Sequence, residues 1–194
     1  MFLLSRMENS YTAGDYTNTY NGLSGTYKNT GMARKIAERI SFLSPTAPGK
    51  PAVPFVKRDK DGRLIDLAAY KGKVVLLDFW GSWCGPCRAS HPHLKELYAR
   101  YKNKGFEIIA IAQERAQTPQ EQRAKWLEAI DKDGVSWTHI LNNEAKQEQD
   151  LVKEYRVTSF PTKILLDREG KILLRISASA TDDIDRALEK MLGE

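Results

Sequence analysis

The sequence predicts an α/β domain with a central mixed β-sheet flanked by helices. Two nearly continuous apolar runs, residues 73–80 and 106–112, are typical of strands buried on both faces. From about residue 51 onward, segments with helical spacing of apolar residues alternate with such strands, which is the order expected of this class. The 194-residue chain is long enough for one such domain and a smaller appendage.

The first fifty residues differ in composition from the rest. Residues 8–31 are rich in Asn, Thr, Ser, Gly and Tyr without a convincing period, and we expect residues 1–31 to be weakly structured or the remnant of an upstream domain. Residues 32–50 predict a connector, because helical spacing extends to residue 43 and a proline-rich linker follows. The folded domain is therefore expected over residues 51–194.

The first half of this domain predicts an N-terminal β-hairpin, a strand and a helix. Residues 54–67 should form the hairpin and turn at Asp61–Gly62. After the strand at 73–80, leucines and tyrosines at helical spacing predict a helix from about Cys84 to Lys102. Pro92 lies inside that helix, so we expect a kink there.

Beyond the strand at 106–112 comes an inserted segment and a C-terminal hairpin. A capping box at Thr118 and Glu121, with proline at the first helical position, predicts a helix through Ile130. The next three expected elements are a strand, a short helix and a hairpin, at residues 135–141, 151–155 and 162–176. Thr181 is expected to cap a last amphipathic helix.

Charge and hydropathy limit the partners. The net charge of +5 comes from Lys and Arg interspersed with Asp and Glu, which is typical of a solvated surface and not of a nucleic-acid or anionic-membrane footprint. No apolar run approaches the roughly 18 residues of a membrane span. The apolar start is too short for a signal peptide, so we expect either a cytoplasmic protein or a chain without its natural beginning.

Both cysteines lie in one short motif. A bond between Cys84 and Cys87 would close a tiny loop and stabilise little, so a chemical purpose is favoured. A Cys84–Cys87–His91 metal site is a less favoured alternative, since structural zinc takes four ligands. The thiolate is the reactive form and a helix N-terminus stabilises it, so Cys84 is expected to attack and Cys87, three residues on, to resolve.

The motif Trp83-Cys84-Gly85-Pro86-Cys87, directly after a buried strand, resembles the active site of the thioredoxin superfamily. The resemblance spans most of residues 49–194 and is greatest to the TlpA/ResA-type branch of membrane-anchored or secreted bacterial thiol–disulfide oxidoreductases. It implies a thioredoxin-like fold and thiol–disulfide oxidoreductase activity, with no cofactor beyond a redox-active Cys84–Cys87 disulfide. Because Gly85–Pro86 matches reducing thioredoxins, a relatively reducing couple is expected, near the thioredoxin value of about −270 mV.

The resemblance also implies roles for neighbouring residues. Asp78, a carboxylate inside an apolar run, matches the buried aspartate that accepts the resolving cysteine's proton; the alternative is a structural pair with a lysine. Phe160–Pro161 matches the cis-proline loop that docks substrate; the alternative is a trans proline at an edge strand. Substrate contacts are also expected at Trp83, Gly85 and Pro86. Ser90 departs from the branch, which often has glutamate there, and its role and that of His91 stay open.

The implied partners are disulfide-containing protein substrates and a membrane or thioredoxin-type reductant. The implied location is the periplasm or cell envelope, with the cytoplasm as the alternative, and no membrane contact is expected from this segment itself. Envelope thiol homeostasis and cytochrome c maturation are the tasks that the resemblance suggests. Two other functions stay open: a thiol peroxidase, although Gly81 stands where its usual threonine would be, and a non-catalytic binding module.

Overall fold

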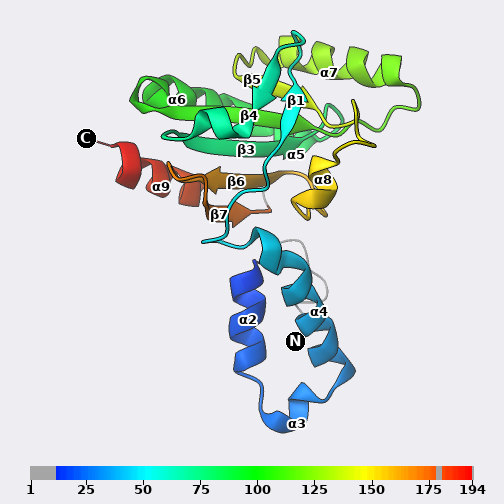
Figure 1. The fold of residues 1–194 in the computed structure, drawn as a ribbon, viewed down its shortest axis with the longest axis vertical. Coiled ribbons are helices and arrows are strands. Elements are labelled where there is room, and N and C mark those ends of the chain that lie inside the picture. The colour runs from blue at the N-terminus through cyan, green and yellow to red at the C-terminus, as the bar shows by residue number, and fades with distance from the viewer. Residues whose placement is uncertain (1–11, 178–180, 194) are drawn as a thin grey trace.

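The computed structural model describes residues 12–177 and 181–193 and confirms the α/β class. Figure 1 shows a helical arm at the N-terminus standing away from a sheet domain. The main sheet is mixed and five-stranded, in the order β5-β4-β3-β6-β7. Its strands are β3 (Val74–Trp80), β4 (Phe106–Ala112), β5 (Thr138–Leu141), β6 (Thr162–Leu166) and β7 (Ile172–Ile176). A separate antiparallel pair, β1 (Val56–Arg58) and β2 (Leu64–Asp66), is the predicted hairpin.

Strand β3 is the centre of the domain. It pairs in parallel with β4 and antiparallel with β6, and every one of its seven residues is buried. Its side chains alternate between two hydrophobic clusters, because successive residues of a strand point to opposite faces. Leu76, Asp78 and Trp80 define what we call the cysteine-side face, and Val75, Leu77 and Phe79 define the far face.

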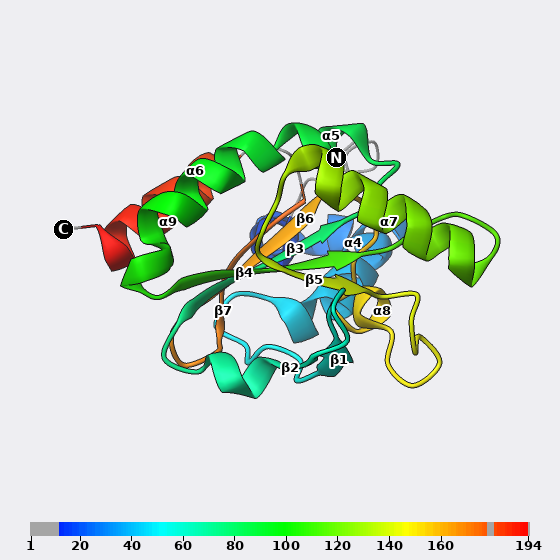
Figure 2. The same ribbon diagram turned by 90° about the horizontal axis from the view of Figure 1, so that it is seen from above.

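Helices cover the two faces unequally. The cluster on the cysteine-side face includes side chains of α5 (Gly85–Ala89), α6 (His91–Tyr101), α7 (Pro119–Asp133) and α9 (Asp182–Leu192), and these helices can be followed over that face in Figure 2. The far face is covered by shorter elements, among them the 3-10 helix η3 (Leu67–Tyr70) and α8 (Leu151–Glu154). The 3-10 helices η2 (Ser44–Thr46) and η4 (Lys102–Lys104) lie in connections.

The helix expected from Cys84 to Lys102 is two helices. Helix α5 ends at Ala89, Ser90 separates it from α6, and Pro92 lies in the first turn of α6. Proline lacks the N–H that a continuous helix would need, so the predicted kink is a complete break. At the last helix, Thr181 is the N-cap residue, but its side chain makes no capping hydrogen bond, contrary to expectation.

Residues 12–31 of the arm are helical and not weakly structured, while the alternative expectation, a remnant of an upstream domain, stays a prediction. Residues 12–31 contain α2 (Ala13–Asn21) and α3 (Gly25–Lys28), followed by the expected connector helix α4 (Gly31–Leu43); residues 1–11 lie outside the described part. A capping box between Thr12 and Asp15 begins α2, which buries Tyr16 in a small cluster with Ile36 of α4. This tertiary packing stabilises a helix whose sequence is too polar to reveal it.

The arm is joined to the sheet domain by polar contacts. Arg39 of α4 donates a hydrogen bond to Thr158 Oγ1 at 3.2 Å, and Arg175 of β7 donates one to Thr46 Oγ1 at 3.3 Å. Among residues 12–177 and 181–193, no helix has the length and apolar character needed to cross a membrane.

Candidate active site

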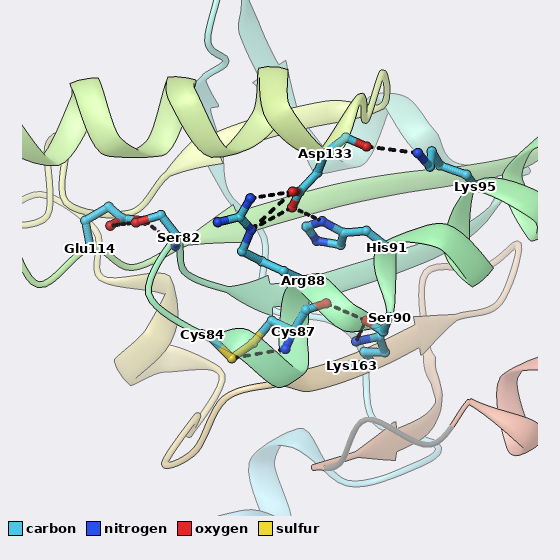
Figure 3. Close-up of polar contacts among 10 residues, drawn as sticks. All are labelled: Ser82, Cys84, Cys87, Arg88, Ser90, His91, Lys95, Glu114, Asp133 and Lys163. Atoms are coloured by element: carbon cyan, nitrogen blue, oxygen red, sulfur yellow. Dashed lines mark hydrogen bonds and ion pairs between the residues drawn. A yellow bond between two sulfur atoms is a disulfide. The ribbon is translucent and has the colours of Figure 1, made fainter.

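The two cysteines follow the end of the central strand. Strand β3 ends at Trp80, and a three-residue loop leads to Cys84, the N-cap residue of α5. Cys84 and Cys87 are joined by a disulfide (Figure 3). The backbone N–H of Cys87 donates to Cys84 Sγ at 3.3 Å. Both cysteines are buried, Cys84 slightly less so, with 3% of the residue exposed against 0% for Cys87.

Two loops meet beside the disulfide. The Phe160–Pro161 peptide bond is cis, as predicted. The rings of Phe160 and Trp83 contact each other edge to face, with centroids 5.5 Å apart, so the loop before β6 and the loop before α5 form one surface. Trp83 also donates from Nε1 to the carbonyl of Gln113 at 2.8 Å, and Gly85 and Pro86 are exposed at the same end of α5.

Asp78 is fully buried on the cysteine-side face, where it faces a lysine. It lies opposite Lys163 in the register of β3 and β6, and Lys163 Nζ is 3.1 Å from Asp78 Oδ1. The lysine pair that the sequence left as the alternative is therefore present. Within the described residues, neither carboxylate oxygen of Asp78 accepts a hydrogen bond, so the contact with Lys163 is an ion pair only. Proton acceptance by Asp78 stays a prediction.

Ser90 connects this pair to the disulfide. Its hydroxyl donates to the carbonyl of Cys87 at 2.7 Å and accepts from Lys163 Nζ at 3.1 Å (Figure 3). Ser90 thus occupies the break between α5 and α6 and is buried there. The position at which the sequence departs from its branch is a structural link between Cys87 and Lys163.

His91, whose role the sequence left open, is a buried residue of α6. It is 1% exposed, its Nδ1 lies 2.8 Å from Asp133 Oδ2, and its ring packs edge-on against Trp80. Burial alone would raise the pKa of Asp133, but hydrogen bonds from Arg88 and His91 lower it. In the described part of the chain, no three His, Cys, Asp or Glu side chains are grouped so that they could hold a metal ion.

A residue that sequence reasoning missed, Glu114, fixes the loop before Cys84. Its carboxylate accepts from the backbone N–H of Ser82 at 2.7 Å and from the Ser82 hydroxyl at 2.6 Å (Figure 3). Glu114 follows the carboxyl end of β4, which pairs in parallel with β3. Functional loops commonly lie at the carboxyl ends of parallel strands, so this position could have indicated Glu114 from the sequence. Arg115, next in the chain, lies with its guanidinium carbon 3.2 Å from the centroid of the Trp83 ring.

Comparison with known proteins agrees with this geometry. The family model described as Redoxin matches residues 47–191. The chain belongs to the Redoxin family. The thiol-disulfide oxidoreductase ResA of Bacillus thuringiensis is 35% identical to it over 149 residues, which is 74% of this chain and 78% of that protein.

Similarity to solved structures places the chain within the thioredoxin superfamily. The thioredoxin domain of a thiol-disulfide oxidoreductase from Bacteroides vulgatus is 32% identical with a TM-score of 0.65, covering 75% of this chain and 98% of that one. A thiol:disulfide interchange protein from Bacteroides sp. is 33% identical with a TM-score of 0.63, covering 76% and 91%. This Redoxin-family member is a ResA/TlpA-like thiol–disulfide oxidoreductase with a thioredoxin-like fold, and its Cys84–Cys87 disulfide fits a dithiol–disulfide cycle.

Proposed function

We propose that this oxidoreductase reduces disulfides in protein substrates, with Cys84 as the attacking and Cys87 as the resolving sulfur. The observation that carries the proposal is the disulfide at the first turn of α5, with Cys84 at the N-cap as the less buried of its two cysteines. The Cys87 N–H that reaches Cys84 Sγ supports the assignment, because a backbone donor stabilises a thiolate at that position.

The cycle proceeds in two exchanges. In the first, the Cys84 thiolate attacks a substrate disulfide, forms a mixed disulfide and releases one substrate thiolate, which takes up a proton. In the second, Cys87 gives its proton to Asp78 and attacks Cys84 Sγ, and the second substrate sulfur leaves as a thiolate that takes up a proton from water. Asp78 then releases its proton to water. The substrate gains two electrons and two protons, and the enzyme is left with its Cys84–Cys87 disulfide.

Substrate docking is proposed at the surface that the two loops form. Trp83 and Phe160 supply its aromatic part, and the exposed Gly85 and Pro86 let a substrate backbone approach closely. Pro161 holds the loop whose preceding residue offers backbone groups to an extended substrate, an arrangement in the manner of strand addition.

We further propose the periplasm or cell envelope as the site of action, with electrons from a membrane or thioredoxin-type reductant and no dissociable cofactor. The ResA/TlpA resemblance supports this, since that branch is membrane-anchored or secreted. It also supports envelope thiol homeostasis, of which cytochrome c maturation is one form.

Trapping tests the assignment of the two sulfurs. Cys84→Ser should reduce insulin disulfides at no more than the uncatalysed rate, at least about 100-fold below the wild type, because no attacking sulfur is left. Cys87→Ser should accumulate mixed disulfides at Cys84 that mass spectrometry can identify. If Cys84→Ser accumulated mixed disulfides at Cys87 as readily as Cys87→Ser does at Cys84, the division of roles would be contradicted.

A further inference from the structure

Three successive residues after β4 contact the loop between β3 and α5. The carbonyl of Gln113 accepts from Trp83 Nε1 at 2.8 Å. The Glu114 carboxylate accepts from the backbone N–H and from the hydroxyl of Ser82 (Figure 3). The guanidinium of Arg115 lies over the Trp83 ring, with its carbon 3.2 Å from the ring centroid. The first two contacts satisfy polar groups of the loop, whereas the third holds a cation at the surface.

The charge of Arg115 is not used inside the described chain. The residue is exposed, and in the part of the chain that the structure describes it forms no ion pair and donates no hydrogen bond. The carboxylate of its neighbour Glu114 is directed to Ser82 instead. By contrast, Arg88 of α5 is paired with Asp133. The five N–H donors of the Arg115 guanidinium are therefore available to a partner.

Trp83 places this cation beside the proposed docking surface. Its ring contacts Arg115 and also contacts the ring of Phe160 edge to face, with centroids 5.5 Å apart. Phe160 comes directly before Pro161 of the cis peptide bond, and Trp83 comes directly before Cys84. Stacking on an aromatic ring restricts a guanidinium, so less side-chain entropy is lost when a partner binds to it.

We propose that Arg115 is a specificity-determining residue, which favours protein substrates that carry an aspartate or glutamate close to the disulfide to be reduced. The inference rests on the proposed function, in which Trp83 and Phe160 dock the substrate. A guanidinium binds a carboxylate through two parallel N–H···O bonds between opposite charges. Arg115 contacts the residue next to Cys84, and an extended substrate rises about 3.3 Å per residue, so the acid should lie within about three residues of the attacked cysteine.

The ratio of rates between substrates separates this role from a merely structural one. If Arg115 only covered the Trp83 ring, its replacement would disturb the docking surface and slow every substrate alike. If Arg115 recognises a carboxylate, its replacement changes the rate for acidic substrates relative to neutral and basic ones. A reversal of charge at position 115 should then reverse the preference, which a structural disturbance does not produce.

The test uses three peptides that differ only beside their disulfide. Each peptide has one intramolecular disulfide, and the residues flanking both cysteines are Glu, Gln or Lys. The reduced full chain is mixed with each peptide at pH 7, and chromatography after acid quenching gives the second-order rate constant. Each constant is divided by that of the same peptide with dithiothreitol, which corrects for the intrinsic reactivity of the disulfide.

The variants are Arg115→Gln, Arg115→Glu and the matched control Arg168→Gln. The control removes the same charge from an exposed arginine between β6 and β7, at the end of β6 opposite Pro161. It therefore separates the local effect of Arg115 from the effect of a lower net charge.

The wild type should reduce the Glu peptide about fivefold faster than the Gln peptide, which is the size of effect that an exposed ion pair gives, and the Lys peptide slowest. Arg115→Gln should abolish the difference between the Glu and Gln peptides, and Arg115→Glu should make the Lys peptide the fastest. Arg168→Gln should keep the wild-type ratios. In the wild type, the preference should shrink as salt is raised, because salt screens exposed charges.

Equal corrected rate constants for the three peptides with the wild type would overturn the inference, whether or not the variants fold. So would an Arg115→Glu variant that keeps the wild-type order, or a preference that Arg168→Gln loses as well. A reduced wild type that reduces none of the peptides would instead refute the proposed function. Failure of the inference and failure of the proposed function thus give different results.

Discussion

The two faces of strand β3 differ in the chemistry that they bury. On the far face, Val75, Leu77 and Phe79 pack in an apolar cluster under short elements. On the cysteine-side face, Asp78 stands between Leu76 and Trp80 and pairs with Lys163 of the neighbouring strand. Both faces are equally excluded from water, since every residue of β3 is buried.

The difference shows where the fold tolerates a cost in stability. Apolar burial on the far face stabilises by about 25 cal/mol per Å² and makes no demand on protonation. A buried ion pair is often no better than a hydrophobic pair of equal size, so it contributes little net stability. We therefore expect Asp78 and Lys163 on the cysteine-side face to serve the chemistry of the site and not the stability of the fold. Three predictions test this contrast between the two faces.

The largest expected effect comes from breaking the ion pair on one side only. Asp78→Asn or Lys163→Met alone should lower the free energy of unfolding by about 3–5 kcal/mol, because the remaining group is left buried and unpaired. The double variant Asp78→Asn/Lys163→Met should regain most of that loss. Urea denaturation at pH 7 measures all three. A double variant as unstable as the worse single one would contradict the account.

A second prediction concerns acid stability on the same face. Burial lowers the pKa of His139 to about 3, whereas the unfolded histidine titrates near 6.5. Between these two pKa values the unfolded chain binds a proton at His139 and the folded chain does not. The free energy of unfolding therefore decreases as the pH falls from about 6.5 toward 3. Between pH 7 and pH 4.5 this loss should be about 2–3 kcal/mol, at about 1.4 kcal/mol per unit.

His139→Phe is the variant that isolates this contribution. It removes the titrating ring and keeps an aromatic side chain in the same place, so its unfolding free energy should fall less on acidification than that of the wild type. Urea denaturation at the two pH values gives the difference. Identical acid dependence in both proteins would show that His139 does not titrate on unfolding.

The smallest expected effect lies on the far face. Ile109→Val on β4 removes one buried methylene group and should lower the free energy of unfolding by about 0.5–1.5 kcal/mol. The rate of insulin-disulfide reduction at pH 7 should not change, because Ile109 faces away from Asp78. A changed rate would mean that the two faces are not chemically independent.

Much of the fold could be predicted because its signals are local. The nearly continuous apolar runs identified β3 and β4, and the capping box at Thr118 identified the start of α7, which ends three residues beyond the predicted Ile130. Helix α2 was missed because its apolar positions are few, although Thr12 and Asp15 form the same kind of capping box. Its stability comes from packing on α4, and a pattern within one segment does not contain such a contact.

The site was predictable only in part, for a related reason. Cys84, Cys87 and Asp78 stand in one motif, so their proximity follows from a single strand and turn. Lys163 lies 85 positions after Asp78, and only the antiparallel register of β3 and β6 brings the two together. A lysine inside an apolar strand is nevertheless the same signal that drew attention to Asp78, and it could have been used.

The buried pair of Asp78 and Lys163 also limits which substitutions the sequence can accept during evolution. A change at either position alone leaves an uncompensated charge in the interior, so a lineage that drifts by single substitutions passes through a destabilised ancestor. The two codons are thus expected to persist together or to be replaced together, and Ser90, which touches the same ammonium, should follow them.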